Sequence, residues 1–157
     1  MTRTCRKDHP HVIAPPPAIY LGFLGLGLLM EQQWPTQIFS GPLMAFVGLL
    51  ILIIGVAGVI TAVRTIIKAR TPVDPYESTT TIVTRGLYRI SRNPIYVFDT
   101  FVYIGLAMSF NSFWAIVLMP LLLWTLQRGV VLREEQYLRC RFGDKYMRYQ
   151  KGVRRWI

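Results

Sequence analysis

Residues 41–63 read GPLMAFVGLLILIIGVAGVITAV and decide how this chain is organised. The stretch has 23 residues and no charged side chain. A helix needs about 20 apolar residues to cross the hydrocarbon core of a bilayer. We therefore expect a membrane-spanning helix here, and an integral membrane protein rather than a soluble one.

Three shorter apolar runs surround this stretch, at residues 18–33, 94–110 and 113–127. The first begins after a triple proline, and Trp34 follows it as an interfacial anchor. The last two form a helical hairpin with a polar tip. We expect an all-α integral membrane fold with about four transmembrane helices, and one domain over residues 1–157, because a separate soluble domain has no room. Glycines in the first two spans are expected to pack these spans against each other.

The basic residues give the expected topology. All 18 Lys and Arg lie before the first apolar run, in residues 64–93, or in residues 128–157. The two remaining loops have none, and basic loops stay on the cytoplasmic side. We expect a multi-pass protein of the bacterial inner membrane, with both termini, the loop 64–93 and a C-terminal helical cap 128–157 in the cytosol. The net charge of +10 then indicates anionic lipid headgroups rather than nucleic acid.

Cysteine and histidine residues add little chemistry. Cys5 and Cys140 both fall in cytosolic segments, so free thiols are expected. His9 and His11 are two possible ligands without a third, so no metal site is predicted.

The cytosolic segments differ in character. The loop 64–93 contains two X-Pro steps and a Ser/Thr cluster, and a loop of this length in so short a chain favours a functional role. The C-terminal segment is basic and aromatic. Gly143 fits the end of one helix and Asp144 the cap of the next, and the segment is expected to lie along the membrane surface.

Three groups of residues carry candidate chemistry. Asn93 and Pro94 fit the start of a helix, which is a structural role. Arg92 beside that start fits a binding site for an anion. The residues alone favour the structural role. The pair Glu134-Glu135 fits either a surface ion pair, such as Glu135 with Arg139, or a site for a cation or a base. Asp99 lies about one and a half turns into the third span, where a carboxylate indicates function or an ion pair with Arg92.

A family resemblance adds to these patterns. The ordered set consists of Gly86-x-Tyr88, Arg92-Asn93-Pro94-x-Tyr96, Glu134-Glu135-x-x-Leu138, Phe142-Gly143-x-x-Tyr146-x-x-Tyr149 and Val153-x-Arg155. Over about residues 71–157 this set resembles the isoprenylcysteine carboxyl methyltransferase and phospholipid methyltransferase superfamily, in the form of a small bacterial member. The resemblance implies an S-adenosylmethionine-dependent integral membrane methyltransferase with its cofactor pocket in the cytosolic half.

The resemblance also implies site residues. The cofactor-binding set on this chain is Gly86, Leu87, Tyr88, Arg92, Asn93, Pro94, Tyr96, Glu134, Glu135 and Tyr146. The catalytic candidates are Arg92, Glu135 and Asp99. A carboxylate suits the cofactor's ammonium, an arginine suits its carboxylate, and tyrosines suit its adenine.

The expected reaction is methyl transfer to a lipid-like or prenylcysteine-type acceptor, a carboxylate or thiol, at the cytoplasmic membrane face. Leu87, Asn93 and Phe98 depart from the family pattern, as does Asp99, which suits an amine acceptor. The alternatives are a phospholipid or amine N-methyltransferase, and a non-enzymatic small proton-coupled transporter that uses Asp99 and Glu31. No oligomeric state is predicted.

Overall fold

The computed structural model describes residues 12–36, 38–39, 41–72, 77 and 79–157. The helices are α1 Pro16–Gln33, α2 Pro42–Lys68, α3 Pro94–Ser109, α4 Phe113–Leu126, α5 Leu132–Phe142 and α6 Asp144–Gly152, with a 3₁₀ turn η1 Gly86–Arg89 and a π-helical turn η2 Gln127–Val131. Extended pairing within these ranges is limited to one isolated bridge between Ser91 and Arg154. The all-helical expectation is confirmed.

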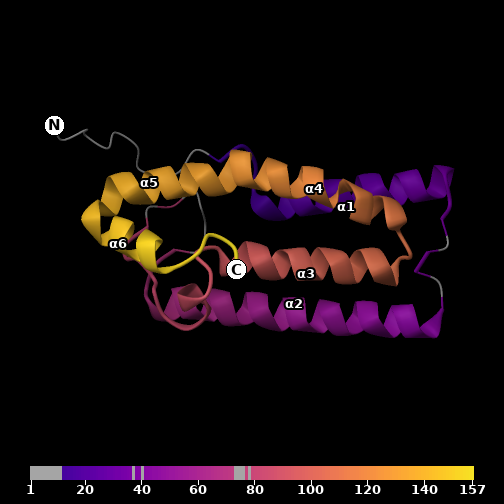
Figure 1. The fold of residues 1–157 in the computed structure, drawn as a ribbon, viewed down its shortest axis with the longest axis horizontal. Helices are drawn as coiled ribbons and strands as arrows, with labels where there is room; N and C mark the ends of the chain where they lie inside the picture. Colours follow the sequence, from indigo (N-terminus) through magenta and orange to yellow (C-terminus); the bar gives the residue numbers. More distant parts are fainter. Residues whose placement is uncertain (1–11, 37, 40, 73–76, 78) are drawn as a thin grey trace.

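The first four helices lie side by side along the long axis of the molecule, and α4 continues through η2 into α5 (Figure 1). Helix α2 packs mainly on α3, and α1 mainly on α4. The buried core lies between α1, α3 and α4, where the Tyr103 hydroxyl donates a hydrogen bond of 2.7 Å to the carbonyl of Ala115.

Proline sets the start of α1, α2 and α3. Each of these helices has Pro in its first turn. A backbone N–H at that position has no partner within the helix, so proline loses no hydrogen bond there. Helix α5 ends at Phe142, and the next residue, Gly143, has a positive φ of 51° that suits glycine. Asp144 was expected to cap the next helix, but it lies in the first turn of α6, with Gly143 at the cap position.

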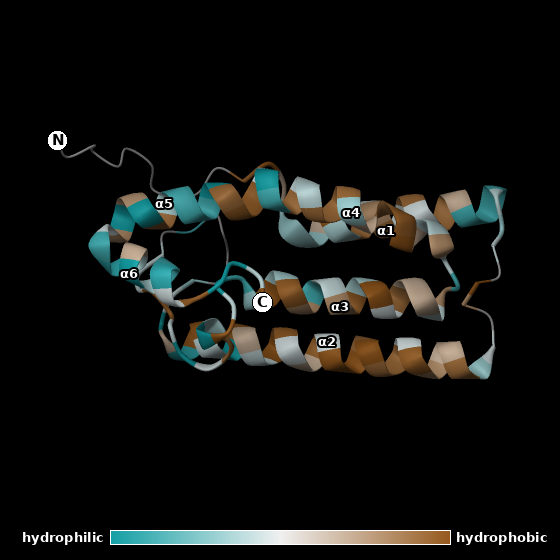
Figure 2. Ribbon diagram, in the orientation of Figure 1, coloured by the Kyte–Doolittle hydropathy of each residue, from teal (hydrophilic) through white to brown (hydrophobic). Residues whose placement is uncertain are grey.

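Two helices are long and apolar enough to cross a membrane among the described residues. They are α2 and the continuous helix Phe113–Phe142, whose apolar part is α4; α3 is apolar but shorter. Apolar residues cover the long bundle, whereas the end bearing α5 and α6 is hydrophilic (Figure 2). Leu43, Phe46, Ile53 and Ile60 on α2 are all exposed. An exposed apolar surface of this extent is typical of a membrane-facing protein.

The glycines pack the helices in different pairs from those expected. A Cβ on Gly105 in α3 would lie 2.6 Å from the backbone nitrogen of Leu52 in α2. A Cβ on Gly27 in α1 would lie 2.6 Å from the Cα of Ala115 in α4, whereas Gly25 has no neighbour within 4 Å. The prediction that the first two spans pack on each other through glycine is therefore wrong. Each of them uses its glycines against one helix of the later hairpin.

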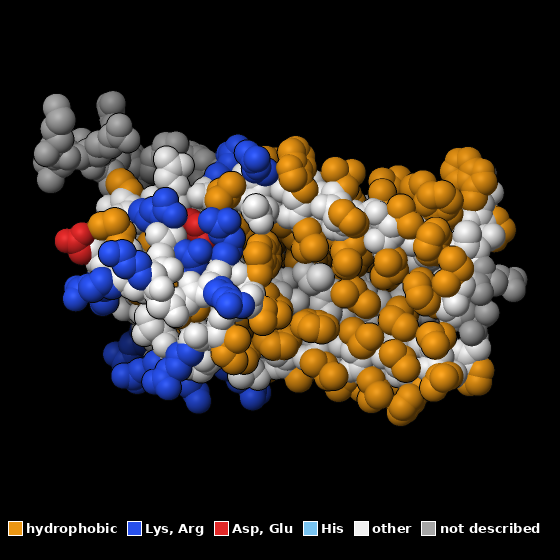
Figure 3. All heavy atoms as spheres, viewed as in Figure 1, with side chains coloured by type: hydrophobic (Ala, Val, Ile, Leu, Met, Phe, Trp, Pro, Cys, Tyr) orange, Lys and Arg blue, Asp and Glu red, His pale blue; other side chains and the backbone are white. Residues whose placement is uncertain are grey.

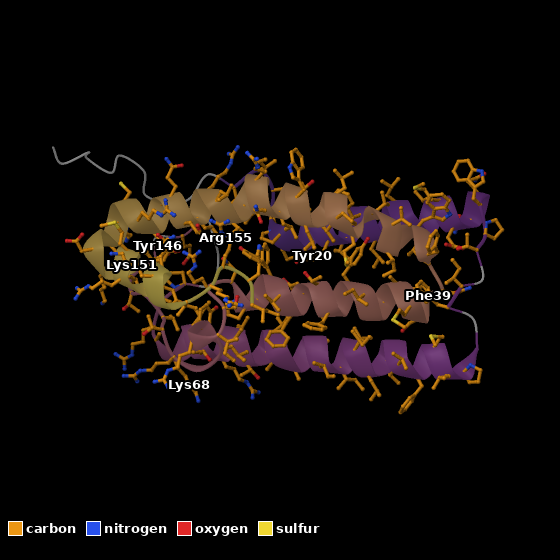
Figure 4. The ribbon with its side chains drawn as sticks, in the orientation of Figure 1. Tyr20, Phe39, Lys68, Tyr146, Lys151 and Arg155 are labelled. Carbon is orange, nitrogen blue, oxygen red and sulfur yellow. The ribbon has the colours of Figure 1, made fainter. Side chains whose placement is uncertain are left out.

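The two loops without basic residues meet at one end of the bundle. The Asn111 Oδ1 accepts a hydrogen bond of 2.8 Å from the backbone N–H of Phe39. Glu31 accepts bonds from both the backbone and hydroxyl of Thr36, and from the backbone N–H of Phe113 at 2.9 Å. Figure 4 shows Phe39 at this end, with Lys68 and Lys151 at the other. The fold thus separates the loops by charge, as the sequence predicts.

One expectation about the thiols is wrong. Cys140 in α5 is disulfide-bonded, whereas a free thiol was expected. That expectation rested on the redox state of the compartment and on no geometry. Cys5, His9 and His11 lie outside the described residues.

Candidate functional site

A cavity opens at the basic end of the bundle, where the start of α3 meets α5, α6 and the loop after α2. Its volume is about 150 Å³, and it opens to solvent on one side. The lining residues are Ile66, Thr71, Pro72, Thr79, Thr81, Ile82, Val83, Tyr88, Arg92, Asn93, Pro94, Ile95, Tyr96, Glu134, Glu135, Tyr137, Leu138, Tyr146 and Tyr149.

Glu135 is the buried centre of an ion-pair cluster. It is 2 % exposed. Its Oε1 lies 3.1 Å from Nη2 of Arg92 and 2.9 Å from Nε of Arg155. Its Oε2 accepts a bond of 3.0 Å from Nη2 of Arg155 and lies 3.8 Å from Nη2 of Arg139. The expected i, i+4 pair with Arg139 is present, but it is the longest of these contacts. Both oxygens of Glu135 are occupied by arginines of the protein itself.

Glu134 has a different environment although it is the next residue. Consecutive side chains on a helix point about 100° apart. The Tyr96 hydroxyl donates a bond of 2.7 Å to Oε1 of Glu134. No ion pair with another described residue involves this carboxylate. Glu134 therefore lines the cavity without a basic partner there, and burial raises the pKa of its carboxyl group to about 7.

Arg92 presents an unmet donor at the same cavity. Its side chain is 10 % exposed, and one nitrogen, Nη2, pairs with Glu135. Its Nε is buried and has no hydrogen-bond partner. A buried donor without a partner costs about 1–3 kcal/mol, and such groups often mark a place where a ligand or water binds. The cavity is thus lined by the Glu134 carboxyl group and by a cation, Arg92, with one unpaired hydrogen-bond donor.

The C-terminal residues hold the start of α3. The backbone N–H of Arg92 donates to the carbonyl of Arg154 at 2.9 Å. The Ser91 hydroxyl and the Asn93 side-chain amide both donate to the carbonyl of Arg155, at 3.1 and 3.0 Å. Asn93 occupies the N-cap position of α3, but its side chain makes no capping bond. The Asn93 side chain donates its hydrogen bond to the carbonyl of Arg155 instead.

Tyrosines form one wall of the cavity. The Tyr149 hydroxyl donates a bond of 2.6 Å to the carbonyl of Tyr88, which ties α6 to η1. The rings of Tyr146 and Tyr149 are 6.0 Å apart. Burial raises the pKa of Tyr146 to about 12, so its hydroxyl stays protonated at neutral pH. Figure 4 shows Tyr146 and Arg155 at this end of the molecule.

The structure gathers most of the predicted site residues, but not all. The ones that line the cavity are Tyr88, Arg92, Asn93, Pro94, Tyr96, Glu134, Glu135 and Tyr146. Gly86 lines a second cavity instead, and Leu87 lines neither. Asp99 lies one turn beyond the cavity along α3 and outside its lining. The alternative of an ion pair between Asp99 and Arg92 is not observed, because Arg92 pairs with Glu135.

Several lining residues were not predicted individually. Thr71 and the segment from Thr79 to Val83 come from the loop whose length and composition favoured a functional role. Tyr137 and Leu138 lie three and four residues after Glu134, which puts them on the same helix face. That spacing is a signal that sequence reasoning can use.

The chain is helical, has two membrane-capable helices, and carries at its basic end a cavity lined by apolar, aromatic and charged side chains. This arrangement defines a candidate small-molecule site in a membrane-associated protein. Comparison with known proteins then gives the family. The family model for phospholipid methyltransferases matches residues 43–145, so the chain belongs to the phospholipid methyltransferase family.

Two relatives match shorter parts. The protein-S-isoprenylcysteine O-methyltransferase of Schizosaccharomyces pombe is 36% identical over 72 residues, which is 46% of this chain and 30% of the relative. An uncharacterized protein of Haemophilus influenzae is 56% identical over 27 residues, 17% of this chain and 43% of that protein. The chain thus aligns with less than half of either relative.

Proposed function

We propose that this chain is an integral membrane methyltransferase that uses S-adenosylmethionine and methylates a lipid-like acceptor at the cytoplasmic face. Membership of the phospholipid methyltransferase family supports the reaction class. One observation supports the cofactor most directly: Glu134 lines the same cavity as Arg92, whose buried Nε has no hydrogen-bond partner. Together they complement the ammonium and the carboxylate of an amino-acid group.

The residues present fit this cofactor. Arg92 would bind the carboxylate through its guanidinium group, of which only Nη2 pairs with Glu135. Glu134 would bind the ammonium, with Tyr96 orienting its carboxylate. Tyr88 and Tyr149 supply aromatic surface for the adenine. In this assignment Glu135 touches no cofactor and positions Arg92.

When bound, S-adenosylmethionine supplies an electrophilic methyl group on a sulfonium. A carboxylate or thiolate needs little acid–base assistance to accept it. The protein's contribution is therefore to orient the reactants and exclude water. Four residues of the loop after α2 also line the cavity and would limit access of water: Thr79, Thr81, Ile82 and Val83.

The first choice of acceptor is a prenylcysteine-type carboxylate or thiol. The alignment with the Schizosaccharomyces pombe relative, named a protein-S-isoprenylcysteine O-methyltransferase, supports it. The second choice is the amine of a phospholipid, which the description of the matching family supports. Asp99 would serve the second choice, because its carboxylate lies one turn deeper along α3 and can bind or deprotonate an amine.

The proposal includes the full membrane topology. We infer four spans, α1 to α4, with both termini and the loop 64–93 on the cytoplasmic side of a bacterial inner membrane. Lys and Arg gather at the end that bears α5 and α6, and apolar side chains cover the rest of the face seen in Figure 3. Thiol labelling tests this topology: a cysteine at Ser109 should react only from outside the cell.

A proton-coupled transporter is less well supported. That alternative relied on Asp99 inside a span and on Glu31 near the end of another span. Glu31 instead accepts hydrogen bonds from Thr36 and Phe113, and so joins two loops at the end of the bundle.

Calorimetric titration of S-adenosylhomocysteine into the purified protein tests the cofactor site. We expect micromolar binding that Glu134→Gln and Arg92→Ala each weaken at least tenfold, about 1.4 kcal/mol. Glu77→Gln is the matched control, because Glu77 is exposed and lines neither cavity. If the folded wild-type protein does not bind, the proposed function is wrong. If only Glu134→Gln binds normally, the ammonium site lies elsewhere.

A further inference from the structure

A second cavity lies beside the end of α2, and its charged lining is entirely basic. It is lined by Thr65, Lys68 and Ala69 of α2, by residues 81–86, and by Lys145 of α6. The basic side chains are Lys68, Arg85 and Lys145, and no acidic residue lines the cavity. All the ion pairs found in the described parts of the chain go to Glu135, so these three cations have no acidic partner there.

The cavity offers more than charge. Thr81 and Thr84 place two hydroxyl groups in its lining, and these can donate to an anion. Gly86 has φ of +60°, and a Cβ there would lie 3.5 Å from the hydroxyl oxygen of Thr65. Its left-handed backbone brings the segment against the last turns of α2. Cations and hydroxyls from three separate parts of the chain therefore converge on one space.

The position of this cavity selects the kind of anion. Lys68 is the last residue of α2, which is one of the two membrane-capable helices. The end of such a helix lies at the depth of the lipid headgroups. On the same helix, Ile60 and Ile67 are exposed and extend the apolar surface up to Lys68. Figure 4 places Lys68 at the end of α2, and Figure 3 shows basic side chains meeting the apolar surface there.

We propose that this cavity is a binding site for the phosphate group of an anionic membrane phospholipid. Lys68, Arg85 and Lys145 hold the phosphate, and the acyl chains follow the exposed apolar face of α2. The shared chemistry is that of any phosphate, but the adjoining apolar face selects a lipid over a soluble ion. The site is separate from the proposed cofactor cavity, although Thr81, Ile82 and Val83 line both.

The test is a calorimetric titration of short-chain phosphatidylglycerol into the full-length, detergent-solubilised protein. Short-chain phosphatidylcholine and inorganic phosphate are titrated in parallel. We expect saturable binding of one phosphatidylglycerol, at least tenfold tighter than either of the other two. The triple variant Lys68→Gln/Arg85→Gln/Lys145→Gln should weaken that binding at least tenfold.

The matched control is Arg128→Gln/Arg148→Gln/Lys151→Gln, which removes the same charge from exposed residues that line neither this cavity nor the cofactor cavity. It should bind within twofold of wild type. Equal losses in both triple variants would mean that only general electrostatic attraction acts, and the site would be rejected. Equally tight binding of inorganic phosphate or phosphatidylcholine would also overturn the proposal. If the triple variant does not fold, the three single variants replace it, each with an expected loss of two- to threefold.

Discussion

The ion-pair cluster around Glu135 makes a quantitative prediction for Arg155→Gln. Arg155 makes two charge-assisted hydrogen bonds to Glu135, at 2.9 and 3.0 Å, from a side chain that is 30 % exposed. Hydrogen bonds to charged groups contribute about 1.5–3 kcal/mol each. Solvent access and the remaining pair with Arg92 reduce the loss. We therefore expect the free energy of unfolding to fall by about 2–3 kcal/mol.

For a chain of this size, 1 kcal/mol shifts the melting temperature by about 2–4 °C. Arg155→Gln should therefore lower it by about 4–12 °C, measured by intrinsic tryptophan fluorescence in detergent. Arg155→Lys should restore only part of the loss, because an ammonium cannot reproduce the bidentate geometry. Affinity for S-adenosylhomocysteine should fall in parallel, because Glu135, which positions Arg92, loses the bidentate partner that fixes its carboxylate.

Two neighbouring arginines supply controls of equal charge. Arg154 is exposed, and its side chain is in none of the ion pairs with Glu135. Arg139 is 3.8 Å from Glu135 and 55 % exposed, so its pair contributes less than about 1 kcal/mol. The order of destabilisation should be Arg155→Gln, then Arg139→Gln, then Arg154→Gln. Equal melting temperatures for the Arg154→Gln and Arg155→Gln variants would refute the assignment of Glu135 as a buried ion-pair centre.

Three further outcomes follow from the same structure. Gly105→Ala should lower the melting temperature by several degrees, because overpacking costs about 1–3 kcal/mol. Gly25→Ala places its methyl group in open space and should keep or raise the melting temperature. Equal shifts for the two variants would contradict the close α2–α3 contact. Glu135→Gln should weaken S-adenosylhomocysteine binding at least tenfold, about 1.4 kcal/mol, and also destabilise the fold, whereas Glu134→Gln should weaken binding alone. Deleting Val130 should convert the π-helical turn to regular helix, because the turn accommodates one extra residue. The orientation of α5 should then be kept, so calorimetry should still find binding of S-adenosylhomocysteine.

Much of the architecture follows from local composition. The uncharged run at residues 41–63 predicts a long apolar helix, and α2 is that helix with its charged last turn added. The prolines at 16, 42 and 94 mark helix starts because Pro fits the first turn. These properties depend on neighbours in the chain, so they can be predicted without a structure.

Helix pairing was not predictable in the same way. The glycine pattern shows that close contacts exist but not with which helix. In the structure Gly105 lies against α2, and Gly27 against α4. Which two glycine-containing helix faces pack together depends on the three-dimensional course of the whole chain.

The roles within the candidate site show the same division. From the sequence alone, apolar length, basic-residue placement and the ordered motif determined an all-helical, membrane-facing chain of a methyltransferase family, with the double Glu as a candidate. Only the tertiary structure distinguishes the surroundings of Glu134 and Glu135. Arg155, 20 residues after Glu135 in the chain, reaches it across the fold and pairs with it, while Glu134 points into the cavity. Electrostatic partnership depends on distance in space, and a linear pattern contains no such distance.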